Sequence, residues 1–293
     1  MKRTDEMVDV LSPHSIDAAH CEARLALGFL NDAGTSRLID RQHFGPLRVQ
    51  KPLYPEGPEI CHAIIVHPPG GVVGGDTLSI KTKVGEGAGA FITTPGAAKW
   101  YKSNGSVSRQ DIHIALGENA TMEWLPQETI FFRSAQVQLN QTINLEKNAR
   151  YIGSDILCFG RTASGEIFDE GVIRQRVSIR LDGKLIWLEQ GSIDGSSTAM
   201  SSPLGLNGNT VCTTLVAVGK PIPSSLINHL RDQLSTITRG HGICNISQLK
   251  SVFVARYLGN SSETAKQCTT WIWQQLRPHF IGRDAVVPRI WNT

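Results

Sequence analysis

Carboxylates beside apolar or aromatic neighbours are the residues of this chain whose types could do chemistry. Those that stand out are Asp76, Glu123, Glu128, Asp155, Glu166, Asp169 and Glu170, with Trp124, Phe131 and Phe168 among their neighbours. Taken singly, each is more often a turn or surface residue. If some of them line an internal cavity, carboxylate oxygens and imidazole offer weak, exchangeable ligands for a divalent metal ion, whereas thiolates would hold it tightly.

A glycine-rich run, HPPGGVVGGD, interrupts the chain from His67 to Asp76. Glycine-rich turns can bind phosphate, but a nucleotide-binding P-loop needs a Lys and a Ser or Thr directly after its last glycine. Here Asp76 follows Gly75, and residues 77–84 alternate like a strand instead of opening the helix that a dinucleotide site requires. The run is therefore predicted to be a structural turn that reverses the chain between residues 63–66 and 77–84.

Familiar catalytic motifs are absent from the sequence, which has no Gly-x-Ser-x-Gly elbow, His-Glu-x-x-His helix, EF-hand loop or kinase signature. Its 6 cysteines include no Cys-x-x-Cys pair and are interpreted as buried thiols. Cys61 and His62 are adjacent, so on a strand they point to opposite faces, and His241 with Cys244 makes too few ligands for structural zinc. Enzyme activity is not indicated, although a site assembled from distant residues stays open as an alternative.

Composition narrows the class of protein. The 293 residues are 40% hydrophobic and include 28 glycines and 14 prolines, which indicates a turn-rich β protein. The net charge is +3 without a basic run, so nucleic-acid binding is not expected. No apolar stretch approaches the ~20 residues that span a bilayer, and residues 1–10 mix charges instead of resembling a signal peptide. We expect a cytoplasmic protein that does not bind membranes.

Period-two alternation predicts many short strands separated by Gly, Pro, Asn or Ser clusters. The clearest is 136–147, where Val137, Leu139, Ile143 and Leu145 share one face. The predicted strands are 23–29, 61–66, 77–84, 90–93, 107–116, 136–147, 151–159, 172–180, 184–189 and 211–218. Because no helices separate them, the fold class is mainly β, and the pattern leaves a sandwich, a barrel and a coiled β solenoid open.

Two helices are predicted late in the chain. After Pro223, with Ser224 and Ser225 as caps, apolar residues at 226, 227, 230, 234 and 237 follow helical spacing. Asn260 and Glu263 resemble a capping pair before a second apolar stripe, which stops before Pro278. We expect the apolar stripe of each helix to pack against the sheets.

Several sequence blocks, taken in order, resemble the urease accessory protein family UreD, also called UreH. The blocks are 48–57 (RVQKPLYPEG), 67–76, 92–103 (ITTPGAAKWYKS), 123–130 (EWLPQETI), 159–161 with 165–166, 254–259 (VARYLG), 276–278 and 288–293 (PRIWNT). The resemblance runs from about residue 23 to the last residue, and an unrelated chain is not expected to carry all blocks in this order. Ala98, where family members often have Thr, is a minor departure.

The resemblance implies a β-rich fold in which short strands form a coiled, β-helix-like or layered arrangement with about two C-terminal helices. It divides the chain into residues 1–22, expected to be disordered, and a single β-rich domain at 23–293. It also implies a non-enzymatic scaffold that joins UreF and the GTPase UreG and acts with them on urease apoprotein, placing nickel in its active site. GTP hydrolysis would belong to UreG, in agreement with the lack of a P-loop here.

For the mechanism, the resemblance leads to the hypothesis that nickel passes through a polar internal path of this protein from UreF and UreG to urease. The residues assigned to the path or to an interface are Asp76, Glu123, Glu128, Asp155 and Glu166, with His67 as a metal ligand. Weak ligation suits a conduit, because a site that bound nickel strongly would trap it. We expect transient nickel(II) and no tightly bound cofactor. The alternative is an adaptor that bridges UreF and urease without touching metal.

Overall fold

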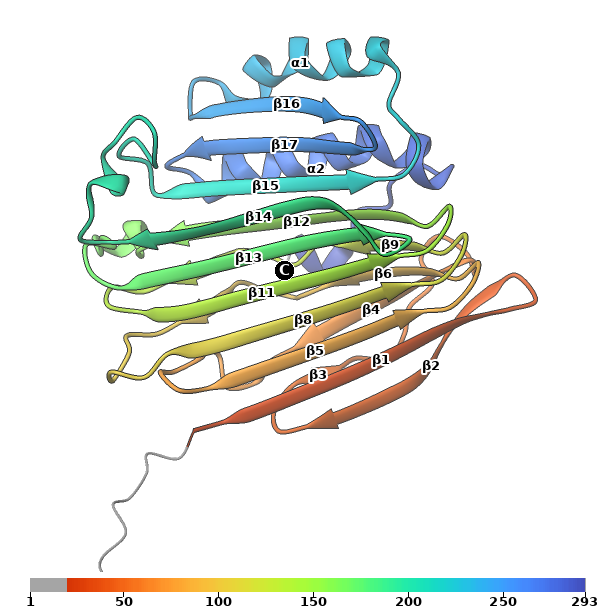
Figure 1. Ribbon diagram of the computed structural model, residues 1–293, viewed down its shortest axis with the longest axis horizontal. Coiled ribbons are helices and arrows are strands. Elements are labelled where there is room, and N and C mark those ends of the chain that lie inside the picture. Colours follow the sequence, from red (N-terminus) through yellow and green to blue (C-terminus); the bar gives the residue numbers. More distant parts are fainter. Residues whose placement is uncertain (1–19, 293) are drawn as a thin grey trace, which may run out of the picture.

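The computed structural model describes residues 20–292, which form two stacked β-sheets with helices on one side (Figure 1). Of the N-terminal segment predicted to be disordered, residues 1–19 lie outside the described residues. The strands are β1 (Glu22–Asp32), β2 (Thr35–Phe44), β3 (Arg48–Val49), β4 (Ile60–Val66), β5 (Thr77–Val84), β6 (Gly89–Thr93), β7 (Ala98–Trp100), β8 (Ser108–Leu116), β9 (Thr121–Trp124), β10 (Thr129–Phe131), β11 (Gln136–Leu145), β12 (Arg150–Phe159), β13 (Val172–Leu181), β14 (Lys184–Asp194), β15 (Val211–Val218), β16 (Ile243–Leu249) and β17 (Val252–Gly259). The helices are α1 (Ser224–Thr238) and α2 (Ser262–Ile281), with short 3-10 turns η1 (Thr162–Ser164), η2 (Thr198–Met200) and η3 (Arg289–Asn292).

The chain alternates between the two sheets, coil after coil. One sheet has the strand order β14-β13-β11-β8-β5-β1-β2, and the other follows β16-β17-β15-β12-β9-β6-β4-β3 with β7 and β10 attached. Within the first sheet β1, β5, β8, β11 and β13 are parallel, and within the second β4, β6, β9 and β12 are parallel. This arrangement is a β solenoid, so the predicted mainly β, solenoid-like class is confirmed.

Antiparallel strands close the stack at both ends. β2 pairs with β1 and β3 with β4 at one end, while β14 pairs with β13 and β15 with β12 at the other. Both helices pack on the ten-stranded sheet, α1 on β16 and α2 on β12, β15 and β17. Figure 1 accordingly shows the outer face of the seven-stranded sheet uncovered by either helix. Among the described residues, no helix combines the length and apolar character needed to cross a membrane.

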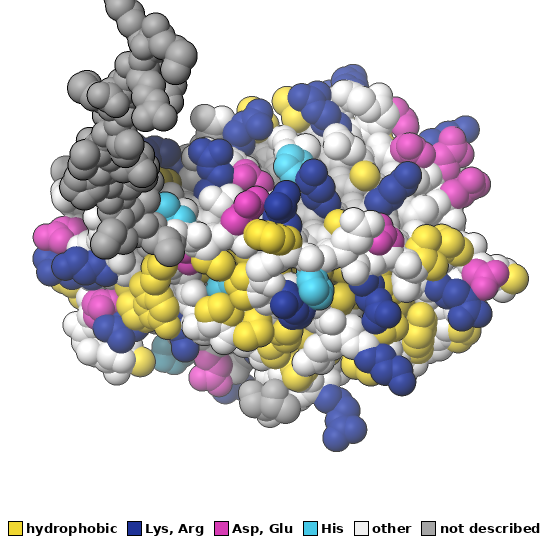
Figure 2. All heavy atoms as spheres, turned by 90° about the horizontal axis from the view of Figure 1, so that it is seen from below, with side chains coloured by type: hydrophobic (Ala, Val, Ile, Leu, Met, Phe, Trp, Pro, Cys, Tyr) yellow, Lys and Arg dark blue, Asp and Glu magenta, His cyan; other side chains and the backbone are white. Residues whose placement is uncertain are grey.

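The β1–β2 end of the stack differs from the rest of the surface. Seen from below in Figure 2, hydrophobic side chains gather in a band across this end, interspersed with Lys and Arg. Ile39 and Phe44 of the edge strand β2 are 61% and 53% exposed. Such exposure of large apolar side chains is typical of surfaces that meet another molecule.

The alternation of apolar and polar residues predicted ten of the strands, two of them, β5 and β15, with the observed bounds. In β11, Val137, Ile143 and Leu145 are buried between the sheets as predicted, and Asn144 faces outward. The strands that were not predicted are β2, β3, β7, β9, β10, β16 and β17. β3, β7, β9 and β10 are too short to show a period, and β2 and β16 are edge strands with few buried residues.

Parallel register stacks equivalent side chains into rows across the space between the sheets. One row is wholly apolar and contains Phe29, Val84, Leu116, Leu145 and Leu181. Two rows in the amino-terminal halves of the strands instead place Gln110, Gln141 and Gln175 among Ala, Leu, Ile and Val. The interior therefore changes from apolar at one end of the coils to partly polar at the other.

Both predicted helices exist, with corrections at their ends. α1 begins after Pro223 without a side-chain cap, so Ser224 and Ser225 do not have the predicted capping role. In α2 the cap is Ser261, whose hydroxyl accepts the Thr264 N–H, while Asn260 accepts an N–H from Thr210 instead. β16 and β17 separate the two helices, so only α2 lies near the C-terminus.

Helix α2 also continues through Pro278 to Ile281, whereas the sequence predicted a stop before that proline. Proline removes one N–H and crowds the preceding turn, which costs most in a helix interior. Here only one further turn follows, and Gly282, with a left-handed backbone, closes it by donating its N–H to the Pro278 carbonyl.

The glycine-rich run 67–76 forms two successive turns, as its composition predicted. The Gly70 N–H donates to the His67 carbonyl and the Asp76 N–H to the Val73 carbonyl. The turns carry the chain from β4 in one sheet to β5 in the other, so they do not close a hairpin. Gly75 has a positive φ of 95°, but Gly74 does not.

A buried ion pair fastens α2 to the ten-stranded sheet. The Arg277 guanidinium, 0% exposed, donates from Nε to both Glu123 oxygens at 2.9 and 3.1 Å, and Trp273 Nε1 donates to the same carboxylate at 2.6 Å. Arg277 also reaches Glu56 at 2.6 Å, and Glu56 contacts His62 at 2.6 Å. One helix, β9, β4 and the loop before β4 therefore share a single buried polar network.

We expect Arg277→Met to lower the free energy of unfolding by about 3–5 kcal/mol, because it leaves the Glu123 carboxylate buried without its cation. Chemical denaturation measures this loss. Arg37→Met is the control, since the exposed Arg37–Asp32 pair contributes only about 0–1 kcal/mol. Equal losses for the two variants would contradict the assigned importance of the buried network.

We expect Gly75→Val to reduce the yield of soluble protein, because a β-branched residue at φ 95° costs about 1–3 kcal/mol and its Cβ would also meet the ring of His20. Gly191→Val is the matched control, since a Cβ there meets no atom within 4 Å and Gly191 is not among the positive-φ glycines. The comparison is made by thermal unfolding and soluble yield. A Gly75→Val protein as stable as the control would show that this turn tolerates a side chain.

Candidate functional site

A cavity of about 220 Å³ lies between the two sheets at the polar end of the interior. Leu78, Ile80 and Ile112 form part of its apolar wall, and Gln110 and Asp155 are among its polar groups. Gly70, Gly96 and Lys99 also line it and are exposed, so the cavity reaches the surface at the loops that follow β4 and β6. The site thus combines access from solvent with a largely apolar wall and a few polar side chains.

Asp155 lines the main cavity and two smaller hollows. Its strand, β12, alternates between Tyr151 and Leu157 facing the other sheet and Ile152 facing α2, and Asp155 belongs to the inward set. The carboxylate lines the main cavity and two further hollows of about 20 Å³ each. Gln175 of β13 donates to it at 3.4 Å. Burial, with a smaller contribution from the charge of Glu189, raises the pKa of Asp155 to about 6.

Glu189 is a site residue that was not predicted. It lies on β14, lines one of the hollows beside Asp155, and forms an ion pair with Arg256 at 2.9 Å. Because opposite strands of the two sheets bring Asp155 and Glu189 together, no motif in the linear sequence joins them. Glu189 lies two residues after Trp187 in the strand predicted at 184–189, so both side chains were expected on the same face of the sheet. This alternation is the sequence signal that could have identified Glu189.

The thiol of Cys212 lies close to both carboxylates. Burial, followed by the charges of Glu189 and Asp155, raises the pKa of Cys212 to about 12. A thiol is a strong metal ligand only as the thiolate, so at neutral pH this group remains protonated and leaves the carboxylate oxygens as the ligands of the site.

His67 lines the same main cavity as Asp155, in the glycine-rich run after β4. Burial lowers the pKa of its imidazole, and the nearby Asp76 carboxylate opposes this shift in part. A neutral imidazole retains a free lone pair for metal ligation. The structure therefore brings two of the predicted path residues, His67 and Asp155, into one cavity.

The other four predicted residues do not line this cavity. The buried Asp76 accepts N–H groups from Cys21 and Val73 at 2.8 and 3.0 Å, and Glu123 is bound by Arg277. Glu166 accepts from the side chain of Arg161 and from the backbone N–H of Arg133. Glu128, half-buried before β10, lies near Cys158. Three of them thus have structural partners that account for their charge.

The potential metal ligands of the described interior are dispersed. Within residues 20–292, no three His, Cys, Asp or Glu side chains come together as a group that could hold a metal ion. All six cysteines are free, and Cys61, Cys158 and Cys268 are buried as predicted, whereas Cys21, Cys212 and Cys244 are only half-buried. Cys61 packs between the sheets while His62 stacks on Phe91 on the other face, so the two do not share a ligand site.

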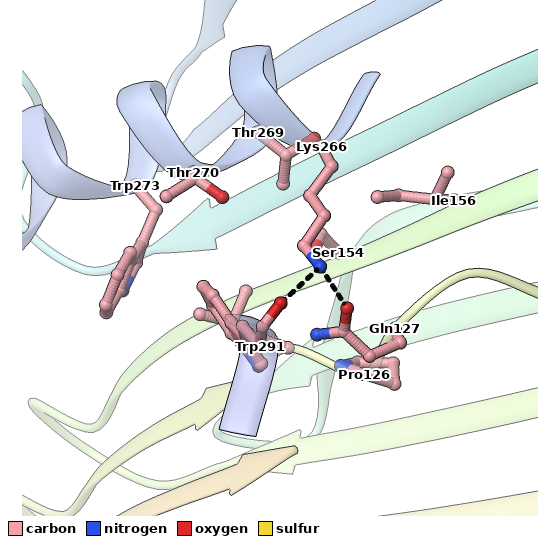
Figure 3. Close-up of a pocket in the computed structure, with 10 residues that line it drawn as sticks. Pro126, Gln127, Ser154, Ile156, Lys266, Thr269, Thr270, Trp273 and Trp291 are labelled. Atoms are coloured by element: carbon pink, nitrogen blue, oxygen red, sulfur yellow. Dashed lines mark hydrogen bonds between the residues drawn. The ribbon is translucent and has the colours of Figure 1, made fainter. Parts of the chain in front are cut away.

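A second small pocket, of about 20 Å³, lies where α2 and the C-terminal turn meet the sheet (Figure 3). Lys266 extends into it from α2 and donates to Gln127 and to the carbonyl of Trp291. Figure 3 shows the ammonium group between these two acceptors. A fixed positive charge disfavours a second cation, so this pocket joins structural elements instead of extending a metal path.

Comparison with known proteins agrees with the resemblance seen in the sequence. A family model described as UreD urease accessory protein matches residues 21–292. A relative from Janthinobacterium sp. (strain Marseille) is 58% identical over 93% of this chain and 92% of its own length. Another from Nitrosospira multiformis is 50% identical over 92% of this chain and 97% of its own length, and both bear the name urease accessory protein UreD. This chain belongs to the UreD family of urease accessory proteins.

Proposed function

We propose that this protein is a non-enzymatic accessory protein of urease maturation that conducts nickel(II) to the urease active site. It acts in the cytoplasm, docked on urease apoprotein together with UreF and UreG, and UreG supplies GTP hydrolysis. The observation that supports this function is the cavity between the sheets, which is lined by His67 and Asp155, together with a separate small hollow that is lined by Asp155 and Glu189. The names of the relatives support a role with urease.

The dimensions of the hollows favour transfer over storage. A volume of about 220 Å³ has room for several water molecules, so a metal ion can enter with much of its hydration shell. Each hollow beside Asp155 has room for about one water, so an ion there must exchange water for protein oxygens. Asp155, Glu189 and the amides of Gln141 and Gln175 provide those oxygens from two sheets. One or two carboxylates with amides bind weakly enough to release the ion.

We expect the double variant Asp155→Asn and Glu189→Gln to lower the nickel content of urease by about tenfold, because amides keep the shape but remove both anionic ligands. The measurement is nickel per urease active site, in cells that lack this gene and are complemented with wild type or variant. The matched control is Glu118→Gln with Asp232→Asn, two exposed carboxylates outside the cavity.

Three results of this experiment have distinct meanings. Fully loaded urease in the uncomplemented deletion would overturn the role in maturation altogether. A deletion without nickel that the cavity variant restores like wild type would leave the role but refute the conduit, and would favour the adaptor. Loss of nickel in the cavity variant alone, with urease still bound, supports the conduit.

The raised pKa of Asp155 predicts that this carboxyl lowers the stability of the folded protein in a pH-dependent way. Because the folded-state pKa of about 6 lies above the ordinary value of 3.8, the folded protein binds the extra proton, and stability falls as pH rises between these two values. Above about pH 6 the cost reaches at most about 3 kcal/mol, at ~1.4 kcal/mol for each pKa unit. Asp155→Asn should therefore raise the unfolding midpoint at about pH 7.5 but not at about pH 4. The same gain at both pH values would contradict a buried, titrating carboxyl.

A further inference from the structure

The outer face of the seven-stranded sheet is basic and uncovered. Its five parallel strands, β1, β5, β8, β11 and β13, hold seven cationic side chains, all exposed: Arg24, Lys81, Lys83, Arg109, Arg174, Arg176 and Arg180. The same five strands contain three carboxylates, and each already has a partner. Glu22 pairs with Arg24, Asp32 with Arg37, and Asp111 accepts from Asn140. In the part of the chain that the structure describes, Arg24 alone of the seven cations forms an ion pair.

The strand register fixes where these charges lie. Lys81 and Lys83 lie on β5, and Arg174, Arg176 and Arg180 lie three strands away on β13. Between these two strands, β11 presents the uncharged Gln138, Asn140 and Thr142 outward, whereas β8 presents Arg109, Asp111 and His113. Two basic columns thus flank a strip of hydrogen-bonding groups, about 14 Å apart at ~4.8 Å for each strand.

The size of the face fits a protein interface. Seven strands at ~4.8 Å spacing, each about nine residues long at ~3.3 Å per residue, cover about 900 Å². A standard protein–protein interface buries about 800 Å² on each partner. A partner of ordinary size can therefore cover the face without any change in the sheet.

The chemistry of the face favours carboxylates over nucleic acid. Guanidinium groups bind carboxylates in a bidentate manner, and the amide and hydroxyl strip supplies neutral donors and acceptors between them. Among the described residues, the outward positions of these five strands hold no Phe, Tyr or Trp on which a base could stack, and His113 is their one imidazole. The chain as a whole carries only +3, which gives little long-range attraction for a phosphate backbone.

We propose that this face is the docking surface for an acidic, carboxylate-rich face of a protein partner. The identity of that partner as a member of the urease assembly rests on the proposed function. The face lies on the opposite side of the seven-stranded sheet from the cavity, and adjacent residues of β13 serve both. Arg174 and Arg176 point outward, and Gln175 between them donates to Asp155.

The variant Arg174→Glu, Arg176→Glu and Lys81→Glu reverses charge on this face at three exposed side chains that take part in no ion pair of the described structure. Lys51→Glu, Lys147→Glu and Lys220→Glu is the control, because it changes net charge equally at exposed positions elsewhere. Association is measured with purified urease apoprotein, UreF and UreG in turn, at about 50 and about 300 mM salt. For one of these proteins, we expect the face variant to associate about tenfold more slowly than the control variant at low salt, and the difference to shrink at high salt.

A charge-neutral variant, Arg174→Gln, Arg176→Gln and Lys81→Gln, guards against loss of folding in the reversed variant, and thermal unfolding checks both. Unchanged association of all three proteins with folded face variants would overturn the proposal. Binding of a short DNA duplex that the face variant alone loses, with protein association intact, would also overturn it in favour of nucleic acid. Since the readout is direct binding and not nickel content, failure here leaves the metal path untouched, and loss of the path leaves this face untouched.

Discussion

In-register stacking of parallel strands is the constraint on which the rest of this structure depends. Each coil contributes one strand to each sheet, and the pairing β1-β5-β8-β11-β13 runs without a shift in register. A residue at one position of a coil therefore lies directly above and below the residues at the same position of the neighbouring coils, inside or outside. A row such as Phe29, Val84, Leu116 and Leu145 becomes a continuous apolar wall, whereas the row that contains Gln110 and Gln175 mixes these amides with apolar side chains. Because strand side chains alternate with a period of two, a slip by one residue would exchange the inner rows for the outer ones.

Two sites with partly or fully buried carboxylates are built on this frame, the Glu123–Arg277 ion pair and Asp155. They differ in whether the charge of the carboxylate has a partner. The Glu123–Arg277 pair is buried under α2, where each charge has a partner and hydrogen bonds satisfy the remaining atoms, so removal of one partner is what costs stability. Burial raises the pKa of both carboxyls, but Arg277 and Trp273 compensate Glu123, whereas Asp155 has no cation at contact distance and only a long hydrogen bond from Gln175. A carboxylate kept at such a cost is typical of a functional site and not of a structural one. That contrast separates two acidic residues that look alike in the sequence.

Sequence alone predicted the frame better than the site, for reasons visible in particular residues. In β11 the alternation of Val137, Ile143 and Leu145 with polar residues is a local property, so the strand and its buried face could be predicted. Glu123 and Asp155 both lie within strands, but the partner that decides their role, Arg277 in one case and Glu189 in the other, is 154 and 34 residues away. Which residues of different coils lie next to each other is determined by how the coils stack, and the sequence of a single strand does not indicate it. The predicted end of α2 before Pro278 was wrong for the converse reason. The local rule that a helix stops before proline was overridden, and Gly282 ends the helix one turn later.

The same alternation would place the proposed metal path and the proposed partner surface on opposite sides of one sheet. Along β13, Arg174 and Arg176 face solvent, while Gln175 and Val177 face the small hollows beside Asp155. A cation that approached the outer face would meet uncompensated positive charge, whereas between the sheets it would meet carboxylate and amide oxygens. If both proposals hold, a divalent ion and an acidic protein surface would bind on opposite sides of the sheet, separated by one sheet thickness. A solenoid suits this arrangement, because successive residues of each strand point to opposite faces of the sheet. The residues of one face can therefore change independently of those of the other face.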